Sequence, residues 1–388
     1  MPISTTANED DDPAEPAVRL HEEAIAARER GDFAAAEEAA QKAVSLFDAI
    51  LGPHSPDLAN ALVEHGRSLQ ELDRLGEAEA AFERAAAILA PLSELPPDEV
   101  APDVAEDLFR LASRARLGRA CALRCAGRLD EAESAYRDEL THLGSRLPED
   151  DGLIASALND LGVVHKFQGR LDEAAAVYKR ALTIVESSGD LGDQATLLHN
   201  LGGLEHARGQ HAAGEPLARR SVEIREKLLG PSHPTTAADR AAWGALLEGL
   251  GRLEEAERAY ADAFAVFEAH LGPDSLEVAS SLTALAGVWR AWGHRDEAEQ
   301  AYRRAAEIRK KKLGANHFDL ALTLNNLGML LAERGQLDEA IVQVSRAAET
   351  LAASLGQDHP NTRIATENRR TLTERRAAET RSPPNAVS

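Results

Sequence analysis

The chain has 388 residues and a formal net charge of −22 at pH 7. This acidic balance argues against binding to nucleic acid or to an anionic membrane surface, because both would repel the protein. Only two cysteines occur, Cys121 and Cys125, which excludes a disulfide scaffold and fits a reducing compartment. The first residues show no secretory leader and no apolar run is long enough for a membrane span, so we expect a cytoplasmic protein.

Internal repeats organise the chain. The phrase Gly-Arg-Leu-(Asp/Glu)-Glu-Ala begins at Gly127, Gly169 and Gly251. Related phrases begin at five further positions: Gly31, Asp73, Gly209, Gly293 and Gly335. Successive copies of this marker are 40 to 42 residues apart, except for one interval of 54 residues. Such a period predicts an array of stacked repeats rather than several separate globular domains.

Each repeat carries two helical patterns. Equivalent positions of the repeats form columns. The first column, five residues after the start of the marker, holds a small residue in every repeat. The second column lies four residues further on and holds Ala40, Phe82, Tyr136, Tyr178, Ala218, Tyr260, Tyr302 and Val344. This spacing puts both columns on one face of a helix. The segment before the marker has its own column of small residues: Gly66, Ala120, Gly162, Gly202, Gly244, Ala286 and Gly328. We therefore predict antiparallel helix pairs that approach closely at the small residues.

Leu-Gly phrases followed by Pro or His join the repeats, and Gly just beyond a helix end is typical of C-caps. Four histidines lie in these turns: His54, His233, His317 and His359. They are separated along the array and cannot converge on one metal ion, so we expect them to cap turns.

These features resemble tetratricopeptide repeats, in the 42-residue form of the kinesin light chain type. The residues that carry the resemblance are the Leu-Gly-Pro-Ser-His-Pro turn at 229–234, the Leu-Asn-x-Leu-Gly phrases at 158–162 and 324–328, and the Gly-x-x-x-Glu-Ala marker. The resemblance covers about Pro16 to Thr380. It implies an all-α, right-handed superhelical α-solenoid of about eight repeats with a C-terminal capping helix. It also implies that the first helices line a concave groove that binds protein segments.

We expect a single solenoid over residues 15–380, between disordered ends at 1–14 and 381–388. The expected repeats are about 15–54, 55–97, 103–148, 149–190, 191–232, 233–274, 275–316 and 317–358, with a capping helix at 360–380. A long helical stretch is expected at 105–126. The long interval contains a Pro-rich insertion at 91–104, a candidate cleavage or switch segment with four candidate residues: Pro91, Glu94, Asp98 and Asp103.

No phosphate-binding loop, nucleophile elbow or zinc-protease helix occurs in the sequence. Cys121 and Cys125 are four residues apart on one helix face, but a metal site would need two more ligands, so we interpret them as small packing residues. We therefore expect no enzymatic activity, no cofactor and no metal site.

The resemblance also implies which positions of the first helices face the groove. They supply ten candidate partner-binding residues: Arg67, Arg114, Arg124, Asn159, Lys166, His199, His206, Thr283, Arg290 and Asn325. Around Arg114, Arg124 and Lys166 they would form a basic track for an acidic segment of a partner. The alternative is that these are ordinary solvated helix positions.

The leading functional hypothesis is a non-enzymatic scaffold that holds a protein segment in the groove. The alternative is a regulatory or inhibitory subunit that restrains an effector, such as a peptidase or transcription factor, until cleavage or release. The partner is expected to be a protein, not nucleic acid or membrane, and the oligomeric state is left open. Arg far outnumbers Lys and Ala is abundant, which favours a bacterial source with a GC-rich genome.

Overall fold

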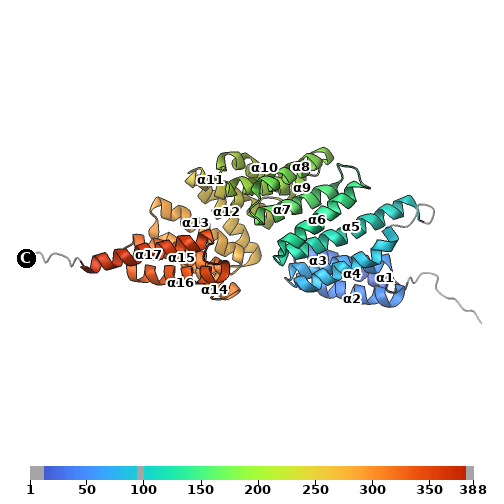
Figure 1. The fold of residues 1–388 in the computed structure, drawn as a ribbon, viewed down its shortest axis with the longest axis horizontal. Helices are drawn as coiled ribbons and strands as arrows, with labels where there is room; N and C mark the ends of the chain where they lie inside the picture. The colour runs from blue at the N-terminus through green and yellow to red at the C-terminus, as the bar shows by residue number, and fades with distance from the viewer. Residues whose placement is uncertain (1–12, 94–99, 382–388) are drawn as a thin grey trace, which may run out of the picture. The chain divides into compact units, whose positions relative to one another are not determined.

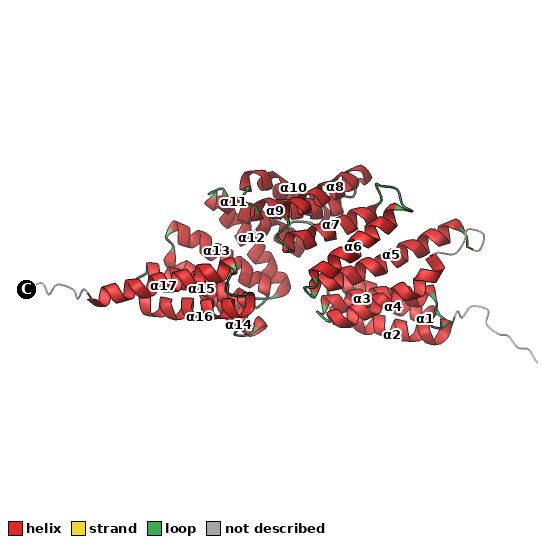
Figure 2. Ribbon diagram, viewed as in Figure 1, coloured by secondary structure: helices red, strands yellow, loops and turns green. Residues whose placement is uncertain are grey.

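The computed structural model describes residues 13–93 and 100–381, and within them the chain forms seventeen α-helices and no strand (Figure 2). Their bounds are α1 Glu15–Glu29, α2 Phe33–Leu51, α3 Pro56–Glu71, α4 Leu75–Ser93, α5 Pro102–Cys125, α6 Leu129–Gly144, α7 Gly152–Phe167, α8 Leu171–Ser188, α9 Leu191–Ala207, α10 His211–Leu229, α11 Pro234–Gly249, α12 Leu253–Leu271, α13 Leu276–Trp292, α14 Arg295–Leu313, α15 Phe318–Glu333, α16 Leu337–Leu355 and α17 Pro360–Arg381. The predicted all-α fold of paired helices is confirmed.

The helices belong to two compact units, Met1–Asp193 and Gln194–Ser388, which we describe separately (Figure 1). Unit 1 contains α1 to α8, and unit 2 contains α10 to α17 with most of α9. In unit 1 each helix packs on the next, and the first helices α1, α3, α5 and α7 also contact one another in sequence. The same pattern joins α11 to α13 and α15 to α17 in unit 2. Within each unit, the first helices of these neighbouring repeats therefore lie side by side.

Small residues allow the two helices of a repeat to approach closely. The eight small residues of the first column after the marker and the eight residues of the second column are all buried. A Cβ atom on Gly66 would lie 2.8 Å from Cζ of Phe82, and one on Gly244 would lie 2.8 Å from Cε1 of Tyr260. At Gly162 the added atom would overlap the ring of Tyr178 even more. The predicted close approach of the two helices at the small residues is confirmed at these pairs.

The turns between repeats bear out most of the capping prediction. Nδ1 of His233, His317 and His359 accepts a hydrogen bond of 3.1 to 3.2 Å from the backbone N–H two residues further on. These histidines thus satisfy one of the N–H groups that a helix start leaves without a partner. The prediction is wrong for His54, because the neighbouring Ser55 caps α3 and accepts from the N–H of Asp57 at 3.1 Å.

The long interval between the second and third repeats is largely helical where it is described. α4 continues through Pro91 to Ser93, and α5 is a 24-residue helix that begins at Pro102, so the long helix expected there is confirmed. Of the candidate switch residues, Pro91 lies near the end of α4 and Asp103 lies in the first turn of α5. Glu94 and Asp98 lie outside the described residues.

None of the helices in residues 13–93 and 100–381 combines the length and the apolar character that crossing a membrane requires.

Candidate protein-binding surface

Two arginines of unit 1, Arg28 and Arg67, pair with one buried carboxylate, and a third, Arg114, lies within electrostatic reach of Arg67. Nε of Arg28 on α1 lies 2.5 Å from Oε1 of Glu64 on α3, and Nη1 of Arg67 lies 3.6 Å from Oε2 of the same residue. The Glu64 side chain is only 4% exposed, whereas that of Arg67 is 43% exposed. Burial lowers the pKa of Arg67, and the nearby charges of Arg28 and Arg114 lower it further, although Glu64 opposes them. One carboxylate therefore neutralises part of a cluster of three positive charges.

A second group of polar residues lies where α5, α6 and α7 meet. Arg124 on α5 is close enough to Asp160 on α7 to oppose the rise of its pKa, but burial dominates and raises that pKa to about 6. The hydroxyl of Tyr136 on α6 donates to Oδ2 of Asp160 at 3.3 Å, and the Asn159 amide donates to Oδ1 at 3.3 Å. Lys166 lies further along α7, and burial lowers its pKa.

Together these bases form what we call the unit 1 basic surface: Arg28, Arg67, Arg114, Arg124 and Lys166. All five lie on first helices that contact one another in sequence. Among the described residues, no carboxylate forms an ion pair with Arg114 or Lys166. Glu64 and Asp160 are the acids that the structure places within the electrostatic reach of these bases. The surface thus carries excess positive charge in a strongly acidic chain.

In unit 2 the predicted residues do not extend a basic track. Arg290 on α13 pairs with Glu333 on α15, with Nε and Oε1 3.0 Å apart. With Thr283 it lines a cavity of about 510 Å³ that also contains Glu248 and Tyr302. The carboxylates around this cavity outnumber its single arginine. The structure therefore brings Thr283 and Arg290 together, but in surroundings that are not positive.

The other predicted residues of unit 2 make contacts within the fold. Nδ1 of His199 lies 2.8 Å from Oδ1 of the buried Asp239, whose other oxygen accepts from the Ser221 hydroxyl at 2.7 Å. The ring of His206 lies 5.1 Å from that of His211. Oδ1 of Asn325 accepts from the amide of Asn368 on α17 at 3.0 Å. These contacts favour structural roles for His199 and Asn325.

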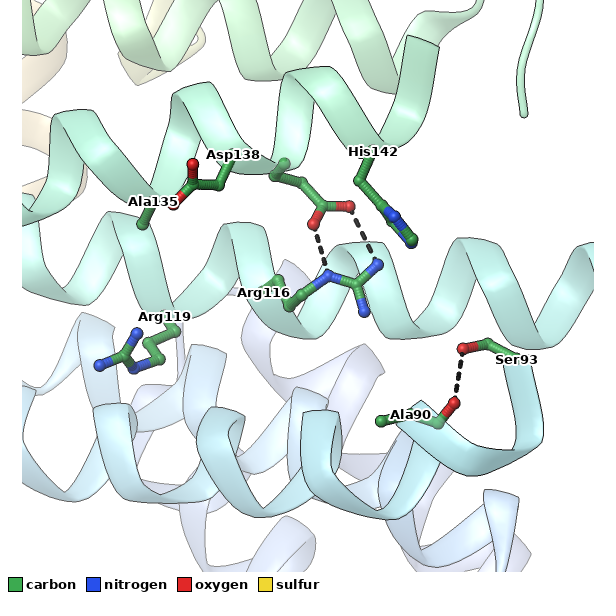
Figure 3. A pocket seen from close by; sticks show the side chains of 8 residues that line it. Ala90, Ser93, Arg116, Arg119, Ala135, Asp138 and His142 are labelled. Carbon is green, nitrogen blue, oxygen red and sulfur yellow. Dashed lines mark hydrogen bonds and ion pairs between the residues drawn. The ribbon is translucent and has the colours of Figure 1, made fainter. Parts of the chain in front are cut away.

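A further cavity in unit 1 is lined by residues that the sequence analysis did not propose as a site (Figure 3). It has a volume of about 360 Å³ and is lined by residues of α4, α5 and α6. Arg116 pairs there with the buried Glu139, with Nη2 3.1 Å from Oε1, and Arg119, Asp138 and His142 complete its polar lining. Arginines and carboxylates are balanced in this cavity, so it selects neither sign of charge. No sequence signal indicated this cavity, because the burial of Glu139 is visible only in the structure.

The structure bears on the residues that could ligate a metal ion and on the two cysteines. No group of three His, Cys, Asp or Glu side chains in the described part of the chain is arranged to hold a metal ion. The interpretation of both cysteines as packing residues is wrong for Cys125, which is exposed, whereas Cys121 is partly buried. Cys125 is the last residue of α5, and the end of a helix buries less of its face than the middle.

Two family models of the tetratricopeptide repeat match the chain. One matches residues 16–90, 107–187, 193–269 and 238–311, and the other matches residues 320–361. Because the matches cover well over half of the sequence, the chain belongs to the tetratricopeptide repeat family, as its motifs predicted. This fold is a protein-interaction fold, so an interaction role in this general sense follows from it.

Solved structures with a similar fold include BtubC (BKLC) from P. vanneervenii, at 22% identity and a TM-score of 0.50, with 60% of this chain and 93% of that chain covered. A Rap protein complexed with Competence and Sporulation Factor is similar at 16% identity and a TM-score of 0.54, over 95% of this chain and 100% of the other. The apo form of RapI is similar at 14% identity and a TM-score of 0.56, over 92% and 98% of the two chains. At these identities the likeness shows the fold alone. No curated protein matches the sequence.

Proposed function

We propose that the protein is a non-enzymatic interaction scaffold that binds an acidic segment of a partner protein on the unit 1 basic surface. The observation that carries the proposal is that Arg114 and Lys166 have no ion-pair partner among the described residues. Arg67, which lies within electrostatic reach of Arg114, is only partly neutralised by Glu64. In a chain with a net charge of −22, such an accumulation of positive charge on adjoining first helices is a local exception.

Partial burial strengthens the case for an anionic ligand. Burial lowers the pKa of both Arg67 and Lys166, which means that their charged forms have lost part of their hydration. A carboxylate placed beside them replaces the lost water with a charge-assisted hydrogen bond, which is roughly twice as strong as a neutral one. An acidic segment would therefore relieve an electrostatic cost that the free protein carries.

Charge reversal tests the proposal. In affinity capture from a native lysate followed by mass spectrometry, Arg114→Glu with Lys166→Glu should reduce recovery of the partner about tenfold. The matched control is Lys179→Glu with Arg180→Glu, which makes the same change in charge at exposed positions of α8. An unchanged helical melting curve shows that both variants are folded. Equal recovery with both variants would contradict the basic-surface proposal.

A second candidate function is regulatory: the protein would restrain an effector and release it after cleavage in the segment that joins α4 to α5. Supporting it is the hydrogen bond of 2.7 Å from Arg146 to the carbonyl of Ser93, which ties the end of α4 to the end of α6. The similarity to a Rap protein complexed with Competence and Sporulation Factor, over 95% of this chain and 100% of the other, is compatible with such a role.

Limited proteolysis tests the regulatory candidate. Cleavage between Ser93 and Pro102 should release a captured effector while the helices on either side remain intact. Protection of this segment against proteases, both in the free protein and in the complex, would count against it.

A further inference from the structure

The last turn of α5 carries both cysteines of the chain. Cys121 and Cys125 are four residues apart, so their side chains are neighbours on one face of the helix. Cys125 is exposed to solvent and Cys121 is partly buried behind it. A reagent can therefore reach the sulfur of Cys125 more easily than that of Cys121.

The charged group closest to the pair is Arg124. Its Nη2 donates to Sγ of Cys121 at 3.2 Å, which orients that thiol within the turn. The pKa of Cys125 is lowered to about 6, chiefly by a hydrogen bond from Cys121 and also by the positive charge of Arg124. Burial raises this pKa, as do the carboxylates of Asp160 on α7 and of Asp73 in the turn after α3. The negative end of the α5 dipole also opposes the thiolate.

Two features thus favour a thiolate at Cys125: a neighbouring thiol that donates a hydrogen bond, and a guanidinium within the same helical turn. Both are features of reactive cysteines, which are partly exposed and lie in electropositive surroundings. The adjacent surface is also basic, because Arg124 belongs to the unit 1 basic surface. An anionic reagent would therefore be attracted to the site although the chain as a whole is acidic.

We propose that Cys125 is a thiol-modification site that forms mixed disulfides with small anionic disulfides, with Cys121 and Arg124 as the residues that position and activate it. The Cys125 thiolate attacks one sulfur of the small disulfide. A new S–S bond forms while the original S–S bond breaks, and the departing thiolate takes the bonding electron pair and then a proton from water. No further oxidant is required, because the disulfide itself is reduced.

The rate of this exchange on the intact protein tests the proposal, with dianionic 5,5′-dithiobis(2-nitrobenzoate) as the probe and the released coloured thiolate as the readout. At pH 6 the folded chain should react about tenfold faster than the same chain in urea, because a larger thiolate fraction outweighs the lower nucleophilicity of a less basic thiol. Above pH 7 its rate constant should level off. A rate that rises about tenfold per pH unit up to pH 8, as for an ordinary thiol, would overturn the proposal.

Variants assign the reactive sulfur and the activating groups. Cys125→Ser should abolish the fast reaction, whereas Cys121→Ala should leave one reactive thiol whose rate at pH 6 has fallen several-fold. Arg124→Gln should slow both probes at pH 6, because the thiolate fraction of Cys125 falls, and should slow the anionic probe several-fold more than the neutral probe 4,4′-dithiodipyridine. A fast reaction that survives in Cys125→Ser, or equal slowing of both probes by Arg124→Gln, would contradict the assignment. The readout is chemistry at sulfur, so it is independent of partner binding.

Discussion

At the scale of single residues, the size of the side chain determines which residue fits at most positions where the two helices of a repeat meet. Gly162 on α7 faces the fully buried ring of Tyr178 on α8, and its missing side chain is the space that the ring occupies. Glycine costs helix stability in the interior of a helix. Its presence here is therefore explained by the close approach of the two helices and not by backbone conformation.

Gly162→Ala should accordingly destabilise unit 1 by about 1–3 kcal/mol, because the added methyl group displaces the Tyr178 ring in a packed core. The control is Gly152→Ala at the start of the same helix, where an added Cβ meets no atom within 4 Å. Urea unfolding followed by circular dichroism measures both. Equal stability of the two variants would show that the helix pair adjusts without cost.

A second prediction at this scale concerns Asp160 and the dependence of protein stability on pH. Burial raises its pKa from 3.8 to about 6, so between these values the folded protein binds a proton that the unfolded chain does not. The contribution of Asp160 to stability therefore falls as pH rises from about 4 to 7. As pH rises over this range, the unfolding free energy of Asp160→Asn should increase by about 2–3 kcal/mol relative to that of the wild type. A difference in unfolding free energy that stays constant with pH would contradict this.

At the scale of the helix, the turn histidines show that similar sequence phrases can place different residues at the helix cap. His317 caps α15 through Nδ1, whereas His54 is exposed and leaves the cap of α3 to Ser55. Both histidines follow a Leu-Gly phrase at the end of the preceding repeat. The difference depends on the residue that occupies the position directly before the helix, because only that side chain reaches the free N–H groups.

Replacing His317 by Ala should therefore destabilise unit 2 by about 1 kcal/mol, because a backbone N–H loses its acceptor. His54→Ala should change stability by less than about 0.5 kcal/mol, as is usual for an exposed side chain. Thermal unfolding of both variants distinguishes the two roles. A larger effect at His54 than at His317 would overturn the assignment of the caps.

At the scale of the whole molecule, the arginines and lysines predicted for the groove that have no ion-pair partner among the described residues all lie in unit 1. The unit 2 arginine that the groove hypothesis named, Arg290, is paired with Glu333 and lies near Glu248. The equivalent surface in unit 1 keeps Arg114 and Lys166 without ion-pair partners among the residues that the structure describes. An acidic partner segment would therefore be bound by one unit and not by the full length of the array.

Neutral substitutions measure this asymmetry. Arg114→Gln should weaken binding of a captured acidic partner about threefold to fivefold, while Arg290→Gln should change it less than about twofold. Binding to the wild type should also weaken as NaCl is raised from 0.05 to 0.3 M, because salt screens exposed charges. Salt-independent binding, or a larger effect at Arg290, would place the interface elsewhere.

The sequence by itself determined the repeat period, the helix pairs, the small-residue columns and most of the helix caps. These features depend on contacts within one repeat, where the 3.6-residue period and side-chain size already specify which residues meet. The resemblance to tetratricopeptide repeats also proposed four of the five bases of the unit 1 basic surface, and it did not propose Arg28.

Only the tertiary structure decided which of those bases are neutralised. The ion pairs that neutralise these bases join different repeats, such as Arg28 with Glu64 and Arg290 with Glu333. No periodic pattern in the sequence specifies these pairs. It likewise decided that Asn325 contacts the last helix and that Cys125 is exposed. The physical reason is that charge pairing and exposure depend on distances between side chains of neighbouring repeats, which lie far apart along the chain and meet only when the helices stack.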